Sequence, residues 1–258
     1  MFPGYKMVDL SQTWCALTPT WPYFPSSKQW NFHSHHKDGV QSIIIETNMH
    51  SGTHVDAPLH FSPWGPDMAA MPLERLVAQT VVVDISDLCT EDFVLFSAED
   101  LKQRLPAPVN KGDAVIVYSG WHKYNWEHER DDEKYFCRCP GPDLSVTDWM
   151  IEREVTWCGM DAPSFEHPLN TAIRDYRPDL AKECAHKAGH ADIEEYMPRE
   201  IWMLHCHKRM MRRGQMHVDN IGGDIARLRG QKVLVGAFPW KWYTGDASIA
   251  RVVAFVKE

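Results

Sequence analysis

The 258-residue sequence lacks any segment that marks export, membrane insertion or nucleic-acid binding. Its first residues, 1–6, have neither the basic segment nor the apolar run of a secretory signal. No apolar run is long enough to cross a bilayer. The net charge is −8 and the basic residues are scattered, so the basic face of a nucleic-acid-binding protein is missing. We therefore expect a cytoplasmic protein whose partners include neither a membrane nor a nucleic acid.

Cysteine is also sparse. The seven cysteines are an odd number and do not form the framework of a small disulfide-rich protein, so we expect reduced thiols. Cys137 and Cys139 are separated by one residue, a narrower spacing than closed zinc sites usually have. We expect them to be surface thiols on a polar loop. Internal repeats and low-complexity tracts are absent as well, and the length suits one large domain or two modest ones.

Strand-like runs recur along the chain, rich in β-branched residues and bounded by turn formers. Continuous apolar runs of this kind suit strands that are buried on both faces. The candidate strands are 42–47, 81–85, 114–118, 155–160, 233–237 and 251–256.

Helical patterns are fewer. Ser97 is followed three positions later by Asp100, a variant of the capping box that begins many helices. The candidate helices are 97–105, 145–153, 178–190 and 205–213. Together the two patterns predict an α+β fold in which strands dominate. Two further segments, 121–142 and 168–199, look like inserted surface loops, either functional lids or solvated excursions.

Four potential metal ligands fall within eleven residues: His50, His54, Asp56 and His60. Imidazole nitrogens and a carboxylate oxygen are the ligands that zinc and manganese take in proteins. A surface turn is the alternative explanation. So many potential ligands in so short a segment favour a metal site.

The local backbone expected here is a strand end followed by a turn, because Gly52 and Pro58 oppose a helix. In an extended chain His54 and Asp56, two residues apart, face the same way. Gly52 would let the backbone turn tightly enough for His50 to converge on the same point.

The remaining histidine clusters are weaker candidates. The group at 33–36 lies in a polar approach to a strand, and His186 and His190 lie on a charged segment, so both are expected at the surface. His205 and His207 interrupt an apolar stretch, which favours hydrogen-bonded core histidines.

The segment His50-Ser-Gly-Thr-His54-Val-Asp56-Ala-Pro-Leu-His60-Phe61 resembles the HxGTHxDxPxHF signature of the cyclase-like metal hydrolase family, which includes bacterial kynurenine formamidase and isatin hydrolase. Similar segments occur along nearly the whole chain. They are 8–11, 18–22, 71–84, 112–121, 159–164, 218–221 and 238–241.

The resemblance implies a swivelling β/β/α architecture, with a mixed central sheet and flanking helices, as a single domain over 1–258. It implies assembly as a homodimer or homotetramer. It also implies that His50, His54 and Asp56 bind a divalent metal, zinc or manganese, and that Asp56 can bridge two ions. His60 takes the general acid/base role.

Family members with two metals add a histidine and an acidic residue twelve positions later, a spacing that His207 and Asp219 have here. The family usually has glutamate in place of Asp219, so both one and two ions remain open. Trp21 matches an aromatic residue of the substrate pocket, with a core tryptophan as the alternative.

The sequence thus predicts a hydrolase in which metal-activated water cleaves an amide C–N bond of an arylformamide or a cyclic amide, both small-molecule substrates. Eleven tryptophans, among them Trp21, Trp64, Trp240 and Trp242, favour a planar substrate. The alternatives are a lactone or cyclic-imide hydrolase, a silent metal- or ligand-binding homologue, and a structural zinc site.

Overall fold

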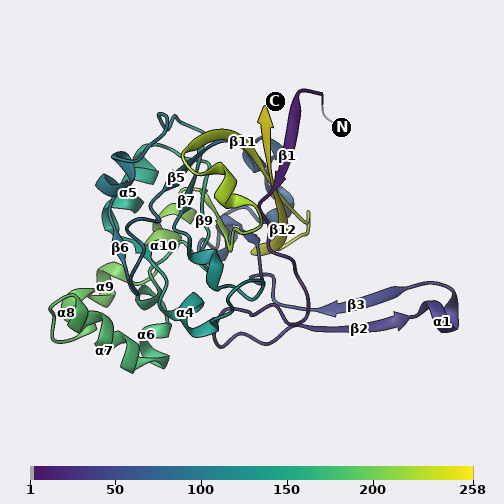
Figure 1. Ribbon diagram of the computed structural model, residues 1–258, viewed down its shortest axis with the longest axis horizontal. Coiled ribbons are helices and arrows are strands. Elements are labelled where there is room, and N and C mark those ends of the chain that lie inside the picture. The colour runs from purple at the N-terminus through teal and green to yellow at the C-terminus, as the bar shows by residue number, and fades with distance from the viewer. Residues whose placement is uncertain (1–2, 258) are drawn as a thin grey trace.

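The computed structural model describes residues 3–257, and its centre is a curved eight-stranded sheet (Figure 1). The strand order is β1-β12-β11-β5-β7-β9-β10-β4, and β12 also pairs with β4, which closes the sheet on itself. β5, β7, β9 and β10 run parallel to one another, and the other pairings are antiparallel. The strands are β1 (Tyr5–Asp9), β4 (His54–Asp56), β5 (Val77–Asp84), β7 (Ala114–Tyr118), β9 (Trp157–Met160), β10 (Met216–Asp219), β11 (Gln231–Pro239) and β12 (Ala247–Lys257).

Alternate residues of the strands fill two separate hydrophobic cores. In β5, Val82 belongs to a cluster that takes residues from all eight strands and fills the space inside the curved sheet. Val81 and Val83 belong to a second cluster, which packs against helices on the outer face. Successive strand side chains point to opposite faces, so apolar runs such as this one are buried on both sides.

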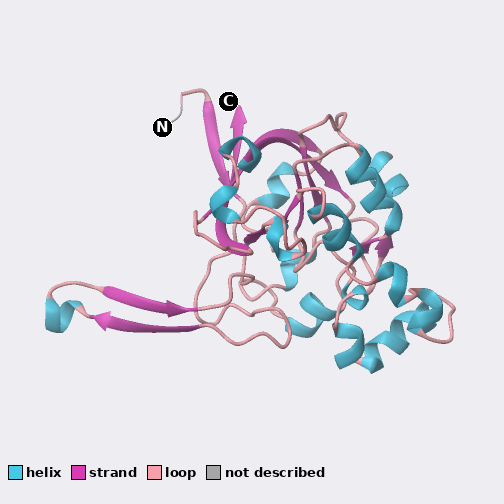
Figure 2. Cartoon of the chain, turned by 180° about the vertical axis from the view of Figure 1, so that it is seen from behind, coloured by secondary structure: helices cyan, strands magenta, loops and turns pink. Residues whose placement is uncertain are grey.

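Helices cover this outer face (Figure 2). α5 packs against both α10 and α3, and the short strands β6 (Leu95–Phe96) and β8 (Gly141–Pro142) pair beside them. The helices are α1 (His35–Asp38), α2 (Leu73–Leu76), α3 (Ala98–Lys102), α4 (Asp132–Cys137), α5 (Leu144–Glu152), α6 (Ile173–Tyr176), α7 (Pro178–Lys187), α8 (Ile193–Tyr196), α9 (Arg199–Trp202) and α10 (His205–Met211). Between Pro3 and Lys257, no helix combines the length and the apolar character that a membrane span requires.

The predicted α+β fold with a mixed central sheet and flanking helices is confirmed. All six candidate strands and all four candidate helices are present. The capping box of α3 is complete, because Ser97 and Asp100 each bind the other's backbone N–H. α5 begins earlier than expected, with Asp143 as its N-cap in place of Ser145.

The two segments described above as inserted loops contain helices, and they contribute to the outer core. α4 lies within 121–142, and α6, α7 and α8 lie within 168–199. Trp121, Leu169 and Ile173 are fully buried. The expectation that Cys137 and Cys139 are surface thiols is wrong, because both pack into this core. All seven cysteines are free.

A two-stranded arm projects from the body (Figures 1 and 2). It consists of β2 (Lys28–His33) and β3 (Ser42–Glu46), joined by the short helix α1 at its tip. The apolar run 43–45 was expected in a strand buried on both faces, and this is wrong: Ile43, Ile44 and Ile45 are 39–48% exposed. The pattern correctly predicts a strand here, but within residues 3–257 no second layer packs against it.

Candidate metal centre

The seven residues predicted to form the site line one cavity, which has about 780 Å³ of empty space when the open solvent at its mouth is included. The structure therefore brings together side chains from four distant parts of the chain. They are Trp21, His50, His54, Asp56, His60, His207 and Asp219.

The cavity floor is formed by two neighbouring strands with the same tripeptide, His-Val-Asp. β4 carries it at 54–56 and β10 at 217–219. The strands pair antiparallel, which places His54 opposite Asp219 and Asp56 opposite His217. Directly opposite residues share one face of a sheet. The two valines face the inner core, so two imidazoles and two carboxylates share the other face.

The turn before β4 sets the direction of its histidines. Gly52 has a left-handed φ of +62°, which glycine adopts without steric cost. Its carbonyl accepts a hydrogen bond from Nδ1 of His54 at 2.8 Å, so Nε2 of His54 is left to face Asp56. His50 lies on the other side of this turn and converges on the same carboxylate, as expected.

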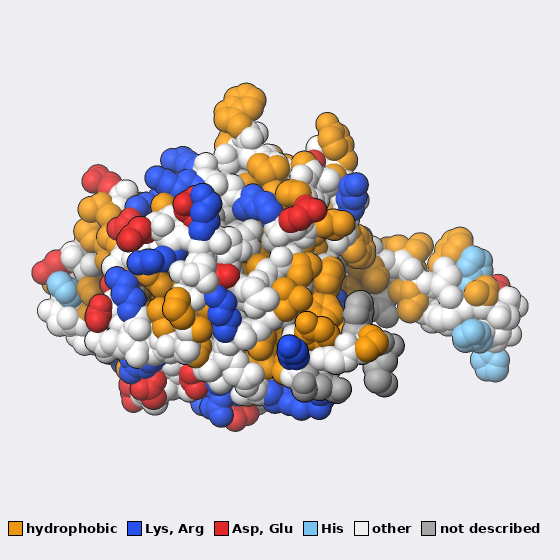
Figure 3. Space-filling model, turned by 90° about the horizontal axis from the view of Figure 1, so that it is seen from above, with side chains coloured by type: hydrophobic (Ala, Val, Ile, Leu, Met, Phe, Trp, Pro, Cys, Tyr) orange, Lys and Arg blue, Asp and Glu red, His pale blue; other side chains and the backbone are white. Residues whose placement is uncertain are grey.

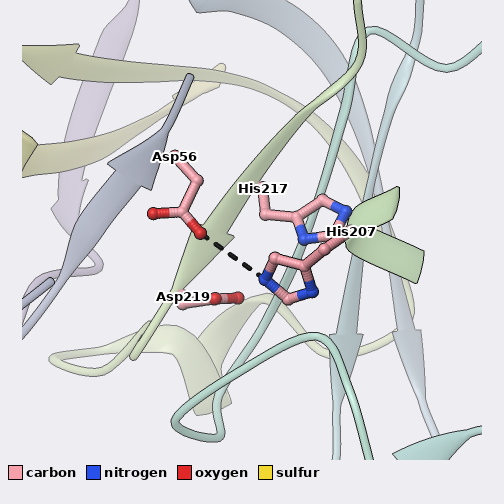
Figure 4. Close-up of side chains that lie close together, drawn as sticks. All are labelled: Asp56, His207, His217 and Asp219. Carbon is pink, nitrogen blue, oxygen red and sulfur yellow. Dashed lines mark ion pairs between the residues drawn. The ribbon is translucent and has the colours of Figure 1, made fainter. Parts of the chain in front are cut away.

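Asp56 is buried, and its two oxygens face different groups. Oδ1 lies 2.8 Å from Nδ1 of His50 and 3.3 Å from Nε2 of His54. Oδ2 lies 3.6 Å from Nε2 of His207, the contact drawn in Figure 4. Burial would raise the pKa of Asp56, but the neighbouring His50 and His54 hold it well below its usual value. This carboxylate is ionised and placed between two sets of imidazoles.

Asp219, the second carboxylate, also reaches this cluster. Its Oδ1 accepts a hydrogen bond from the backbone N–H of Phe165 at 3.0 Å. Burial and the nearby charge of Asp56 raise the pKa of Asp219 to about 7. A pair of buried carboxylates disfavours full ionisation unless a positive charge lies between them.

The donor set fits a divalent cation. Both ring nitrogens of His217 are buried without a hydrogen-bond partner, and Asp56 Oδ1, although 2.8 Å from His50 Nδ1, makes no hydrogen bond of regular geometry. Burial lowers the pKa of His217 well below its usual value, which leaves the imidazole in the neutral form that binds metals. Candidate ligand atoms of Asp56, His207, His217 and Asp219 all lie within 4.8 Å of one another. His50, Asp56 and His60 form a second group that meets the same limit.

His207 is held in place by a buried carboxylate. It lies on α10, where Glu166 Oε1 accepts hydrogen bonds from its backbone N–H and from its Nδ1, at 3.1 and 3.2 Å. Nε2 is thereby directed at Asp56. Metal-binding histidines commonly donate their other ring N–H to a carboxylate in this way, which fixes the tautomer and makes the ring a better ligand.

His60 stands at the cavity rim, in the 3-10 turn Pro58–His60. Its Nδ1 lies 3.4 Å from Asp246 Oδ2, which also lies 3.1 Å from Nε2 of His50. Asp246 precedes β12 and is tied to the signature segment, because its carbonyl accepts a hydrogen bond from the N–H of Ala57 at 2.8 Å. Burial lowers the pKa of His60, whereas Asp246 opposes this shift.

Sequence analysis missed three of these residues. His217 could have been found, because the tripeptide His-Val-Asp occurs twice in the chain. Glu166 and Asp246 carry no such signal, since they reach the site only through the folding of distant segments. The histidine groups at 33–36 and 186–190 lie outside the cavity lining: the first is at the arm tip, and in the second His186 is on α7 and His190 follows this helix.

The family model described as "Putative cyclase" matches residues 8–167. The chain belongs to this family. Kynurenine formamidase from Erythrobacter litoralis is 27% identical over 164 residues, covering 62% of this chain and 68% of that protein. Kynurenine formamidase from Bordetella petrii is 26% identical over 183 residues, covering 69% and 79%.

Solved structures share the fold of this cyclase family member. Isatin hydrolase A from Labrenzia aggregata, bound to benzyl benzoate, aligns with a TM-score of 0.76 at 19% identity, covering 99% of this chain and 95% of that one. An isatin hydrolase bound to the product analogue thioisatinate aligns with a TM-score of 0.78 at 17% identity, covering 99% and 94%.

The upper walls of the cavity are aromatic in this family member. Trp21, Phe24, Phe61 and Phe136 line it, and Trp21 packs edge-on against Phe136 at 6.2 Å between ring centroids. Among the other tryptophans named above, Trp64 is 96% exposed and lies outside this lining. Trp21 thus lines the cavity and also packs against the outer core.

We predict that Glu166→Gln weakens divalent metal binding by about 10–100-fold, the usual effect of losing an outer carboxylate partner of a metal-binding histidine. The amide keeps the size of the side chain but removes the charge behind His207. Metal titration of the apoprotein measures this, with Glu200→Gln, an exposed site, as the control. An unchanged affinity would show that Glu166 does not support a metal ligand.

Proposed function

We propose that this protein is a metal-dependent hydrolase that cleaves an amide C–N bond of an arylformamide or a cyclic amide. The observation that carries the proposal is the buried Asp56, whose two oxygens face imidazoles on opposite sides at the floor of a cavity with aromatic walls. Family membership and the kynurenine formamidase relatives support the same reaction class.

In this proposal His50, His54 and Asp56 hold a divalent cation, and His207 and Asp219 hold a second one. When bound, such a cation lowers the pKa of a coordinated water to about 7 and polarises a carbonyl oxygen. Zinc and manganese both accept imidazole and carboxylate ligands. The free thiols favour a reducing compartment such as the cytoplasm.

His60 moves the proton in the proposed reaction. Its Nδ1 faces Asp246, which orients the ring and leaves Nε2 for the reacting groups. Because burial lowers its pKa, His60 is neutral at pH 7 and can accept a proton. It can then donate that proton to the departing nitrogen, the step that amide cleavage requires.

The aromatic walls of the cavity are the reason for proposing a planar substrate. Trp21, Phe61 and Phe136 offer flat apolar faces to the cavity, where an aryl ring can pack with its amide group beside the proposed metal ligands. We therefore assign Trp21 a role in substrate binding.

A substrate panel tests the reaction class. We expect the protein loaded with zinc or manganese to hydrolyse an arylformamide or a cyclic aryl amide faster than lactones or cyclic imides lacking an aryl ring. Product formation for each compound and metal is the measurement. Faster turnover of the non-aromatic lactones or imides would reject the amide assignment.

A second prediction concerns His60. His60→Ala should lower kcat by about 10²–10⁴-fold, because general acid–base help is typically worth that much. Metal content, measured by elemental analysis, should remain at the wild-type level. Loss of metal would instead make His60 a ligand, and wild-type turnover would leave it without a role in catalysis.

We also propose that the protein is a homodimer joined through its arm. A lone two-stranded hairpin is at best marginally stable in water. Trp30 and Ile44 pair on one face of this arm, and Ile43 and Ile45 lie on the other. Figure 3 shows hydrophobic side chains exposed along the arm, with histidines at its tip.

A second copy of the chain fits this surface because the body carries a further apolar surface. The loops around 62–68 and 240–246 are tied together by backbone hydrogen bonds and expose Trp64, Trp240 and Tyr243. In a two-fold dimer the arm of each chain would pack against the body patch of the other chain. The same arrangement would therefore cover both arms and both patches. The 19 residues of the arm, 28–46, approach the 20–30 residues per side of a standard interface.

The double variant Trp30→Asp/Ile44→Asp should convert the dimer to a monomer, because both charges would be buried in the contact. Light scattering after size exclusion should give twice the chain mass for the wild type and for Gln103→Asp, an exposed control outside both contact surfaces. A monomeric wild type, or a dimeric double variant, would argue against the arm contact.

A further inference from the structure

His217 is the least explained polar side chain beside the cavity: it neighbours Asp56 but is not part of the cavity lining. It is fully buried, yet neither Nδ1 nor Nε2 has a hydrogen-bond partner. The other buried histidines of residues 3–257 each bond through at least one ring nitrogen: Nδ1 of His54 bonds to the carbonyl of Gly52, and Nε2 of His167 bonds to that of Phe93. Buried polar groups in native proteins are rarely left without a partner, so this imidazole calls for a ligand.

The position of His217 follows from the pairing of the two His-Val-Asp strands. It lies directly opposite Asp56 and two residues before Asp219, so all three side chains share one face of the sheet. From the other side α10 brings His207 to the same point, with ring centroids of His207 and His217 4.4 Å apart. Figure 4 shows the two carboxylates facing the two imidazoles.

We propose that His217 is a direct ligand of a second divalent cation, which it holds together with Asp56, His207 and Asp219. The inference rests on the proposed metal-dependent function and adds a further ligand to the second ion of that proposal. The first ion would lie on the Oδ1 side of Asp56, with His50 and His54. The second would lie on the Oδ2 side, so that Asp56 bridges the two.

The distances suit such an ion. Zinc ligands at about 2.0–2.1 Å in a tetrahedral shell lie about 3.4 Å from one another. Oδ2 of Asp56 and Nε2 of His207 are 3.6 Å apart, and the four candidate atoms lie within 4.8 Å of one another. A small contraction of the side chains would therefore complete the shell.

The charges also suit it. The carboxylates of Asp56 and Asp219 would together balance the charge of one divalent cation. Oδ1 of Asp219 is held by the N–H of Phe165, which leaves Oδ2 for the ion. His207 is fixed from behind by Glu166, so the ligand on α10 is already oriented.

The test counts ions in the intact protein. Apoprotein prepared with a chelator is titrated with Zn²⁺ or Mn²⁺, and bound metal per chain is measured by elemental analysis. The variants are His217→Phe, which keeps a ring without nitrogen, and Met216→Leu, a buried control on the same strand whose side chain faces the inner core. Circular dichroism checks that each variant is folded.

We expect two ions per chain in the wild type and in Met216→Leu, and one in His217→Phe. In His217→Phe the second ion should bind more than about 100-fold more weakly than in the wild type. Loss of a hydrogen-bond partner behind a metal ligand already costs about 10–100-fold, and loss of the ligand itself should cost more. If His217→Phe does not fold, His217→Gln replaces it and should show the same loss.

Two ions of unchanged affinity in the folded His217 variant would overturn the inference, and so would a single ion in an active wild type. Either result would leave the proposed hydrolase standing. A wild type that binds no divalent cation, or hydrolyses amides without one, would instead reject the proposed function itself.

Discussion

The antiparallel pairing of β4 with β10 is the interaction on which the site depends. It places the carboxylates of Asp56 and Asp219 on one buried face together with the imidazoles of His54 and His217. Burying two carboxylates so close together is costly without a compensating positive charge. The raised pKa of Asp219, about 7, expresses that cost. A divalent cation would remove it, so the ion that the proposed chemistry uses would also relieve this electrostatic cost.

The surrounding structure supports this pair of strands from both sides. The inner core anchors Val55 and Val218, the central residues of the two tripeptides. On the outer side, Glu166 fixes His207, and Asp246 links His50 to His60. The side chains of the candidate metal site are thus held by hydrogen bonds and ion pairs from segments far apart in the sequence. This kind of support keeps a site in its productive geometry.

Much of this arrangement could be predicted from the sequence, and the reasons differ from one part to another. Strands such as β5 and β7 are buried on both faces, so their sequences are continuous apolar runs. Such runs can be recognised in the sequence without knowledge of the fold. His50, His54 and Asp56 are close in the chain, so a local turn at Gly52 suffices to bring them together.

Other parts depend on tertiary contacts that no local pattern records. Glu166 and Asp246 become site residues only when α10 and the start of β12 dock beside β4. In the arm the sequence pattern gives the wrong prediction, because Ile43–Ile45 has the composition of a buried strand but lies exposed. Composition predicts that such a strand is covered, and the proposed second copy of the chain would supply that cover.

Removal of metal from the folded protein tests the central claim most directly. Amide hydrolysis and thermal unfolding are measured before and after chelation, and again after zinc or manganese is restored. The account predicts that activity is lost with the metal and returns with it, while the chain stays folded throughout. Full activity in metal-free protein, or unfolding as soon as the metal is removed, would contradict a catalytic cation at Asp56.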